Sequence, residues 1–441
     1  MPTPLYDALR GLAEARPLRL DMPGHHGFSL PEGFPWPSAL DFTENGHTGD
    51  LYGGEPDAIR AAEDLWAARL GFDSCLFLTG GSTQGIHGGL ALLAGAGGAV
   101  ALDRGSHRSA FHALALLDLK PVFLPRPWLT EEGVAGPISP EAVEKTLSAR
   151  PEVKTVCITS PTYYGVLSDV PAIAGVCRAH GAKLMVDGAH GAHLPFLGYE
   201  GYRAADVVVM SAHKTLPAPG QTALLLANSF GLGDLQRWGS VYGTSSPSYV
   251  LMSALDAVRD YMEGKGTARY RETAQRLDGL RSRRPALRPR DGLSLDPARL
   301  TLFSPDGFAL ADALRARGIY PELADRGHVV CILTCADGPA ELERLERALE
   351  ESGLSGPPAS VPPPPEPPPV VLTPRQALFA PRERVPLADS AGRVCAGQIA
   401  PYPPGVPVIA PGERIEKKHL AYLAEIGYNR DDCDVIQHRE E

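Results

Sequence analysis

The sequence predicts an α/β fold with a mostly parallel, doubly wound sheet covered by helices. Short apolar segments bounded by turn residues recur through the first 250 residues, as buried strands do in such sheets. Helix-like stretches separate several of these segments, and this alternation favours parallel strands joined by helical crossovers. The expected strands are residues 74–79, 98–103, 120–125, 154–160, 182–187, 206–211 and 222–228.

The helix-like stretches and the proline content divide the chain into parts. Helices are expected at residues 55–71, 139–150, 248–264 and 338–353. Proline dominates the segment after residue 355 and favours an extended, semi-rigid linker. The expected parts are an N-terminal arm with the large domain (1–250), a smaller α+β domain (251–355), the linker (356–370) and a short C-terminal unit (371–441).

Composition excludes several classes of protein. A chain of 441 residues is long for one core, and a formal charge of −10 argues against a general nucleic-acid binder. The sequence shows no run of about 18 uncharged apolar residues and no apolar signal core at its start, so no membrane association is expected and the protein is expected to be cytoplasmic. Seven scattered cysteines, with Cys331 and Cys335 lacking a partner pair, predict reduced thiols and no metal site.

A lysine follows the expected strand at 206–211, in the stretch SAHKTLPAPGQTALLL. The chain has eight lysines, so Lys214 is not one of a crowd of solvated side chains. A chain leaving a buried strand lines a crevice at the sheet edge. Lys214 is therefore either a strand-end lysine that reaches solvent or an amine positioned to form a Schiff base with an aldehyde.

Glycines and hydroxyl residues follow the expected strand at 74–79. Gly80, Gly81, Ser82 and Thr83 lead into a helix, whose N-terminal N–H groups attract an anion. The stretch matches neither the GxxxxGK[ST] nor the GxGxxG spacing, and a packing turn remains the alternative. It is a candidate phosphate site.

The strand at 182–187 ends in Asp187, and a carboxylate there needs a partner or serves as a turn cap. Asp187 and Lys214 end neighbouring expected strands, and the candidate phosphate site opens at the same edge of the sheet. Together they suit a ligand with a phosphate, a basic ring nitrogen and an aldehyde. Pyridoxal 5'-phosphate (PLP) has all three.

The chain resembles the ornithine/lysine/arginine decarboxylases, a family of fold-type I PLP enzymes. Because the matching motifs begin at residue 21, the short form of the family is expected. The motifs are DMPGHHG (21–27), LYGGEPDAIRAAEDLWAARLGFD (51–73), LTGGSTQGIHG (78–88), LDRGSHRSAFHAL (102–114), ITSPTYYGVLSDV (158–170), VDGAHGAHLPF (186–196), MSAHKTLPAPGQTALL (210–225), GTSSPSY (243–249) and APYPPGVPVIAPGERI (400–415).

The resemblance implies a role for each motif residue. Lys214 would be the Schiff-base lysine, Asp187 would pair with the pyridine nitrogen, and His107 would stack on the ring. His190 would lie beside the cofactor, and Lys214 or His213 would protonate the substrate. The resemblance also implies that Ser82, Thr83, Ser211 and His213 bind or flank the phosphate and that Thr244, Ser245 and Ser246 reach the phosphate of a neighbouring subunit. It assigns no role to His87, His112 or His193.

The motif at 400–415 contains closely spaced prolines and glycines, which hold a loop still. Without the resemblance it reads equally as a rigid surface turn. Glu413 is the one carboxylate between Asp389 and Glu416, and a cationic substrate tail needs an acid. Glu413 is therefore predicted to bind the distal amino or guanidino group of a basic amino acid.

The expected activity is decarboxylation of arginine, lysine or ornithine, in a homodimer or higher homo-oligomer, because such sites usually form between subunits. An aminotransferase or a carbon–carbon lyase of the same fold is the alternative. It would be favoured by an arginine that clamps the substrate α-carboxylate, and the small domain offers Arg299, Arg315, Arg317 and Arg326 in no recognised motif. A cofactor-binding regulator would need a DNA-binding segment or a lost lysine, and neither is found.

Some residues depart from the family pattern, namely His26, Gly105, Pro217 and Gly220. These departures do not decide which amino acid is the substrate or which subfamily the chain resembles.

Overall fold

The computed structural model describes residues 18–20, 42–44, 48–54, 56–401, 406–428 and 430–437. The motif at 21–27, which contains His26, lies outside the described residues. So do Glu55 and residues 402–405 of two further motifs.

The seven predicted strand segments form one seven-stranded sheet in the order β2-β11-β10-β9-β7-β3-β4. The pairs β10–β9, β9–β7, β7–β3 and β3–β4 are parallel, whereas β11 runs antiparallel to both of its neighbours. The mostly parallel fold class is therefore confirmed. The strands are β2 (Ser74–Leu78), β3 (Ala99–Asp103), β4 (Lys120–Leu124), β7 (Thr155–Thr159), β9 (Lys183–Asp187), β10 (Val207–Met210) and β11 (Ala223–Ala227).

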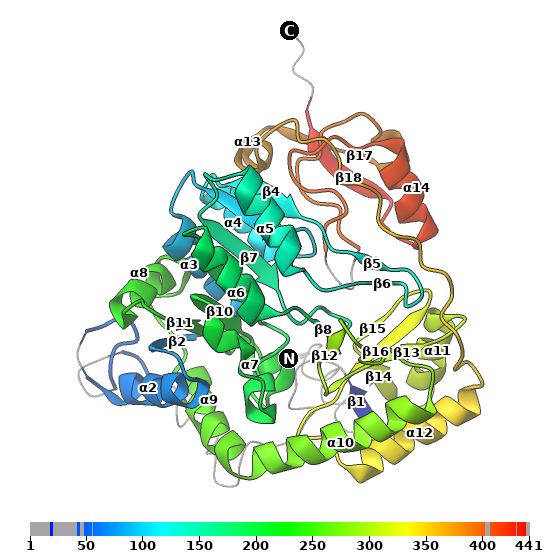
Figure 1. The fold of residues 1–441 in the computed structure, drawn as a ribbon, viewed down its shortest axis with the longest axis horizontal. Coiled ribbons are helices and arrows are strands. Elements are labelled where there is room, and N and C mark those ends of the chain that lie inside the picture. The colour runs from blue at the N-terminus through cyan, green and yellow to red at the C-terminus, as the bar shows by residue number, and fades with distance from the viewer. Residues whose placement is uncertain are drawn as a thin grey trace, which may run out of the picture.

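Helices cover this sheet on both faces (Figure 1). α5 shows why they form where they do: Ser139 accepts a hydrogen bond from the Ala142 N–H, and Pro140 occupies the first turn. The helices of this region are α2 (Ala58–Leu70), α3 (Gly81–Ala94), α4 (Arg108–Leu116), α5 (Pro140–Ala149), α6 (Val170–Ala179), α7 (Ala212–Thr215) and α8 (Leu232–Tyr242).

A second hydrophobic core lies around a smaller sheet. That sheet has the order β13-β16-β15, and the N-terminal strand β1 pairs in parallel with β14 beside it. Leu18 and Leu20 of β1 belong to this second core, so the start of the chain packs with the small region. The elements are β1 (Leu18–Leu20), β13 (Arg299–Phe303), β14 (Ile319–Pro321), β15 (Leu323–Ala324), β16 (His328–Ile332), α11 (Gly307–Arg315) and α12 (Pro339–Ser352).

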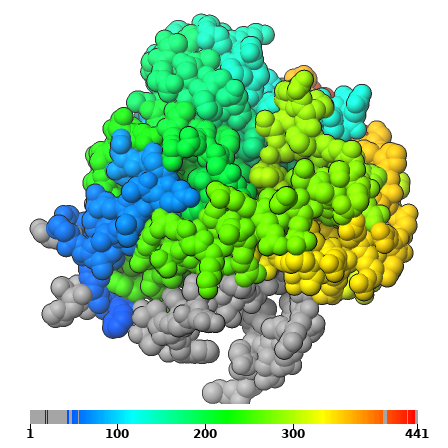
Figure 2. Space-filling view, turned by 60° about the horizontal axis from the view of Figure 1, so that its bottom comes forward, coloured from blue at the N-terminus to red at the C-terminus, as the bar shows by residue number. Residues whose placement is uncertain are grey.

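Two long helices connect the cores. α9 (Tyr249–Tyr261) buries Met252 and Leu255 in the first core, whereas α10 (Thr267–Arg283) buries Leu277 in the second. They form a green band across one face of the molecule (Figure 2). The domain boundary at residue 250 remains a prediction, and the packing of α9 groups this helix with the large sheet.

The C-terminal unit has its own small core (Figure 1), and Arg326, in the turn between β15 and β16 of the small sheet, donates to its Glu425 carbonyl. Residues 356–369 form no helix or strand and run along the outside between the two. The unit contains α13 (Pro374–Phe379), β17 (Arg382–Pro386), α14 (Lys417–Glu425) and β18 (Asp432–Ile436). Two further pairs complete the fold: β5 (Trp128–Leu129) with β6 (Val134–Ala135), and β8 (Val166–Leu167) with β12 (Ser294–Leu295).

All seven cysteines are buried and unpaired, in agreement with the prediction of free thiols. Among the described helices, none combines the length and the apolar character needed to span a bilayer.

Candidate active site

A cavity of about 670 Å³ lies at the carboxyl ends of β3, β7 and β9. This volume falls in the range of small-molecule sites. The structure brings five of the predicted site residues to its wall, although they come from four different motifs: Ser82, His107, Asp187, His190 and Lys214.

Lys214 lies on α7, in the short connection between β10 and β11. Its Nζ atom is 3.2 Å from Nε2 of His190. Burial lowers the pKa of Lys214 below its usual value, and Arg299 adds to this effect, while the Asp187 and Glu322 carboxylates oppose it. A buried amine with a lowered pKa is suited to attack an aldehyde.

Asp187 is the last residue of β9 and pairs in register with Val209 of β10, which places it next to the strand that leads to Lys214. One carboxylate oxygen accepts the Ala189 N–H at 3.1 Å. Burial raises the pKa of Asp187, and the nearby Lys214 opposes the shift. A buried carboxylate that faces a cavity is stabilised by a cationic N–H group. The protonated ring nitrogen of PLP is such a group, so Asp187 fits this cofactor.

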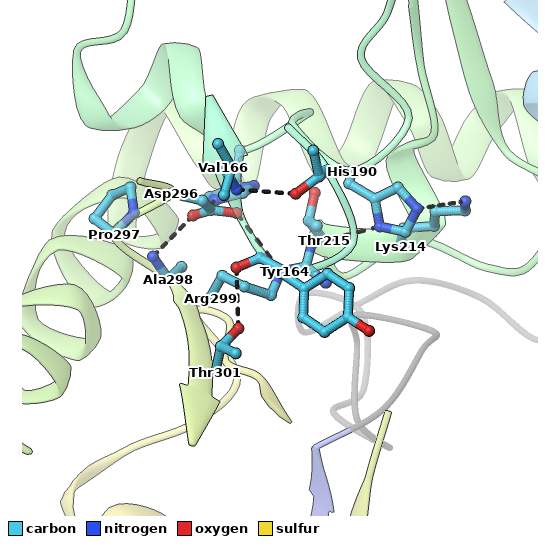
Figure 3. A network of polar contacts seen from close by, with 12 residues as sticks. Tyr164, Val166, His190, Lys214, Thr215, Asp296, Pro297, Ala298, Arg299 and Thr301 are labelled. Atoms are coloured by element: carbon cyan, nitrogen blue, oxygen red, sulfur yellow. Dashed lines mark hydrogen bonds and ion pairs between the residues drawn. The ribbon is translucent and has the colours of Figure 1, made fainter. Parts of the chain in front are cut away.

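His190 lies between Lys214 and Arg299 (Figure 3). Its Nδ1 atom is 3.4 Å from Nη2 of Arg299, and its ring lies 4.4 Å from that of Tyr163. Burial, together with the charges of Lys214 and Arg299, lowers the pKa of His190 well below its usual value. The imidazole is therefore neutral beside the lysine.

Arg299 is the one of the four small-domain arginines with a hydrogen bond in the described structure to a side chain of this site, that of His190, although it does not itself line the cavity. It is 3% exposed, and its Nε and Nη1 atoms have no hydrogen-bond partner in the described structure. Arg315 and Arg317 form surface ion pairs instead, and Arg326 donates to the Glu425 carbonyl. The sequence does not distinguish the four arginines, because no recognised motif surrounds Arg299.

His107 is the N-cap of α4, and its Nδ1 accepts the Ser109 N–H. The ring lines the cavity, where it can cover one face of a planar ligand. Burial and the charge of Lys214 lower the pKa of His107 to about 4. The ring is therefore uncharged at neutral pH.

Two turns meet where a phosphate is predicted to bind. The Gly81 N–H donates to the Gln221 carbonyl, which joins the start of α3 to the turn that follows Lys214. Ser82 lines the cavity, and Thr83 lies in the same helical turn. Ser211 and His213 contact each other at 3.2 Å, and His213 Nδ1 also lies 3.0 Å from the Thr222 carbonyl. These two side chains flank the lysine and do not line the cavity.

Thr244, Ser245 and Ser246 are exposed in the loop between α8 and α9 and do not line the cavity of their own chain. Their predicted contact with a neighbouring subunit stays a prediction.

Glu413 is 1% exposed and does not line the cavity. Its two carboxylate oxygens accept hydrogen bonds from Nη1 and Nη2 of Arg104 at 2.8 and 2.9 Å, and Ala410 N–H adds a third at 2.7 Å. Arg104 also donates to the Val408 carbonyl and itself lines the cavity. The geometry thus gives no support to substrate binding by Glu413: the carboxylate holds Arg104 and joins the C-terminal unit to the large sheet.

The three histidines without a predicted role make structural contacts. His87 contacts the Ser109 carbonyl, His112 contacts Gln398, and His193 forms a buried pair with Asp296 at 2.8 Å.

Sequence analysis missed several residues of the cavity wall. Tyr163 and Tyr164 lie within a recognised motif, which was a usable signal. Asp325 and the linker residues Val361 and Pro363–Pro367 lie in no motif, and no local signal could have placed them here.

Comparison with known proteins identifies the family. The family model of the Orn/Lys/Arg decarboxylase major domain matches residues 3–289, and that of the Orn/Lys/Arg decarboxylase C-terminal domain matches residues 367–429. The chain belongs to the Orn/Lys/Arg decarboxylase family. It is therefore a PLP-dependent decarboxylase, and the predicted family, enzyme class and cofactor are confirmed.

Similar proteins cover nearly all of this decarboxylase. An arginine decarboxylase of Halalkalibacterium halodurans is 30% identical over 96% of this chain and 93% of its own length. An arginine decarboxylase of Bacillus subtilis is 28% identical over 96% of this chain and 93% of its own. The structure of lysine decarboxylase A from Pseudomonas aeruginosa superimposes with a TM-score of 0.75 at 19% identity, over 90% of this chain and 73% of that one, which shows the shared fold.

Proposed function

We propose that this enzyme decarboxylates arginine in preference to other amino acids. The observation that carries the proposal is a cavity of about 670 Å³ whose wall contains Lys214, Asp187 and His107 and also a further carboxylate, that of Asp325 in the small domain. The arginine decarboxylases similar over almost the whole chain support arginine within the family's basic substrates.

PLP, when bound, supplies an aldehyde for the substrate α-amino group and a ring that takes up the electron pair left when CO2 departs. Lys214 would hold the cofactor covalently before the substrate arrives. Asp187 would place its carboxylate beside the protonated ring nitrogen. His107 would cover one face of the ring and exclude water from it.

The bond from Cα to the carboxylate breaks, CO2 leaves, and Cα gains a proton, so that the product is an amine. Lys214 is the better donor of that proton, because its side chain lines the cavity, whereas the Nδ1 of His213 contacts Ser211 and the Thr222 carbonyl outside it. Arg299 does not line the cavity, so it acts on the site through its contact with His190 and is not placed to clamp the substrate carboxylate.

Steady-state kinetics on a panel of amino acids tests the proposal. Arginine, lysine, ornithine, leucine and glutamate are compared by CO2 release, and arginine is expected to give the highest kcat/KM. A higher value for a neutral or acidic amino acid would overturn the basic-substrate assignment, and a higher value for lysine or ornithine would overturn the choice of arginine.

We further propose that the working enzyme is a homodimer or a higher homo-oligomer in which Thr244, Ser245 and Ser246 bind the phosphate of a neighbouring subunit. Their exposure outside the cavity of their own chain supports this. Two inactive variants test it: Lys214→Ala, and the triple change Thr244→Ala, Ser245→Ala, Ser246→Ala. Co-expressed, they should regain activity, because one site of the mixed dimer is then intact. No recovery in a verified mixed dimer would contradict the shared site.

A further inference from the structure

The wall of the active-site cavity is continuous from the catalytic lysine to a second acidic residue. His190 lies 3.2 Å from Lys214 Nζ, and the Tyr163 ring packs on His190. The next residue, Tyr164, donates its hydroxyl to Oδ2 of Asp325 at 2.6 Å. All of these residues line the one cavity, so Lys214 and Asp325 face the same space.

Three carboxylates line the described part of this cavity: Asp187, Asp325 and Glu366. Asp187 belongs to the cofactor end. Glu366 is exposed on the proline linker, where water and salt weaken an ion pair. The Asp325 side chain is 26% exposed, and its interaction with a cation is therefore screened less.

Asp325 is held in place by its own turn. Oδ1 accepts the N–H groups of Gly327 and His328 at 2.8 and 2.9 Å and also contacts His328 Nδ1 at 2.8 Å. Oδ2 accepts a hydrogen bond from the Tyr164 hydroxyl, and its contact with His328 Nδ1 is longer, at 3.0 Å. Oδ1 is thus occupied, whereas Oδ2 retains room for a donor from the cavity.

The charge state of Asp325 suits this role. Burial on its own would raise the pKa of Asp325, but the hydrogen bond and charge of His328 and the Tyr164 hydroxyl bring it below the usual value. The carboxylate is therefore ionised at neutral pH. Its fixed position reduces the entropy lost when a ligand binds.

Aromatic side chains contribute to the cavity wall, and two of them lie close to Asp325. Tyr164 donates a hydrogen bond to its carboxylate, Tyr422 interacts with its charge, and both line the cavity. Aromatic faces pack against an alkyl stem and attract a guanidinium or ammonium group. A fixed carboxylate beside two tyrosine rings is a site for an organic cation.

We propose that Asp325 recognises the distal guanidinium or ammonium group of the substrate and so sets the preference for basic amino acids. This rests on the proposed function, and it assigns to Asp325 the role that the sequence suggested for Glu413. Charge-assisted hydrogen bonds from the cation to Oδ2, with the Tyr164 hydroxyl as a second acceptor, would hold the substrate tail.

The test compares arginine with citrulline, which replaces the guanidinium by a neutral group of similar shape. In the wild-type holoenzyme kcat/KM should favour arginine strongly. Asp325→Asn should lower the arginine-to-citrulline ratio of kcat/KM at least tenfold, mainly through KM for arginine. The absorption band of bound PLP should stay unchanged, which shows that the cofactor end is intact. An unchanged ratio would overturn the proposal.

Two further variants keep the test decisive. Glu366→Gln removes the remaining carboxylate of the described wall outside the cofactor end, and the ratio should stay within about twofold of wild type; a tenfold fall there instead would assign recognition to the linker. If Asp325→Asn does not fold, Tyr164→Phe leaves every hydrogen bond of the Asp325 turn in place and should still lower the ratio at least threefold. A wild-type ratio in a folded Tyr164→Phe enzyme would then contradict the assignment.

The two proposals fail differently. If the wild-type enzyme decarboxylates no basic amino acid, the proposed function itself is wrong. If it prefers arginine and Asp325→Asn keeps that preference, only the role of Asp325 is wrong.

Discussion

The Nε2 atom of His190 lies 3.2 Å from Nζ of Lys214. On the opposite edge of the imidazole, Nδ1 faces Nη2 of Arg299 at 3.4 Å. A guanidinium can only donate hydrogen bonds, so Nδ1 accepts and Nε2 carries the ring proton. The proton on Nε2 then points to Nζ, which can accept it only as an uncharged amine. Arg299 thereby favours the nucleophilic form of Lys214.

Arg299→Gln should raise the pKa of Lys214 in the cofactor-free protein, because a nearby positive charge that lowers it is lost. The pH dependence of amine labelling at Lys214, followed by mass spectrometry, measures this shift. Arg315→Gln is the matched control, since Arg315 forms an exposed ion pair with Asp312 and does not line the cavity. A pKa that stays the same or falls in Arg299→Gln would contradict the account.

Asp187→Asn should bind PLP through its phosphate yet lose at least a hundredfold in kcat. The amide cannot carry the charge that keeps the ring nitrogen protonated, and two pKa units of lost stabilisation amount to about 2.7 kcal/mol. Turnover is measured with saturating PLP, and cofactor content is measured by absorbance. Wild-type turnover in this variant would mean that the carboxylate is only structural.

His107 should make the cofactor-free protein sensitive to acid. The folded pKa of about 4 lies below the ordinary value of 6.5, so between these values the unfolded chain binds more protons. The neutral ring therefore contributes stability that is fully present above pH 6.5. As the pH falls toward 4, the free energy of unfolding decreases by about 3 kcal/mol in all. Urea unfolding at pH 7 and pH 4.5 should show a smaller loss in His107→Phe than in wild type. Equal losses in both proteins would refute this origin.

The pair of Arg104 and Glu413 should stabilise the docking of the C-terminal unit. Glu413→Gln should lower the free energy of unfolding by about 2–3 kcal/mol, because it leaves a largely buried guanidinium without its counter-charge. Asp434→Asn, which removes the half-buried partner of the exposed Arg384 in the same unit, should cost less than about 1 kcal/mol. Similar losses in the two variants would show that the buried pair contributes no more to the free energy of unfolding than the more exposed pair does.

The fold was predictable because its signals are local. Each of the seven strands is a short apolar run, and the sequence shows such runs directly. Lys214, Asp187 and the turn that contains Ser82 could be predicted to lie together because the carboxyl ends of parallel strands meet at one edge of a sheet. The resemblance added His107 and His190, which the structure also places at the cavity.

Contacts between distant segments were not predictable. Arg104 and Glu413 are 309 residues apart, and Arg299 and His190 are 109 apart. Arginines are frequent in this chain, so nothing local marks the one that will be buried. A substrate role was predicted for Glu413 because the sequence does not reveal its partner, Arg104. Asp325 was not predicted because its place in the cavity wall depends on how the small domain packs against the large one.

The central claim is that Lys214 anchors PLP in an enzyme that removes the α-carboxyl group of a basic amino acid. Arginine labelled with 14C at carbon 1 tests it most directly, with wild-type enzyme and Lys214→Ala assayed side by side. The account predicts that wild type releases the label as CO2 in equal amount to the amine formed, and that Lys214→Ala loses nearly all release. Label retained in a 2-oxo acid, or undiminished CO2 release by Lys214→Ala, would contradict it.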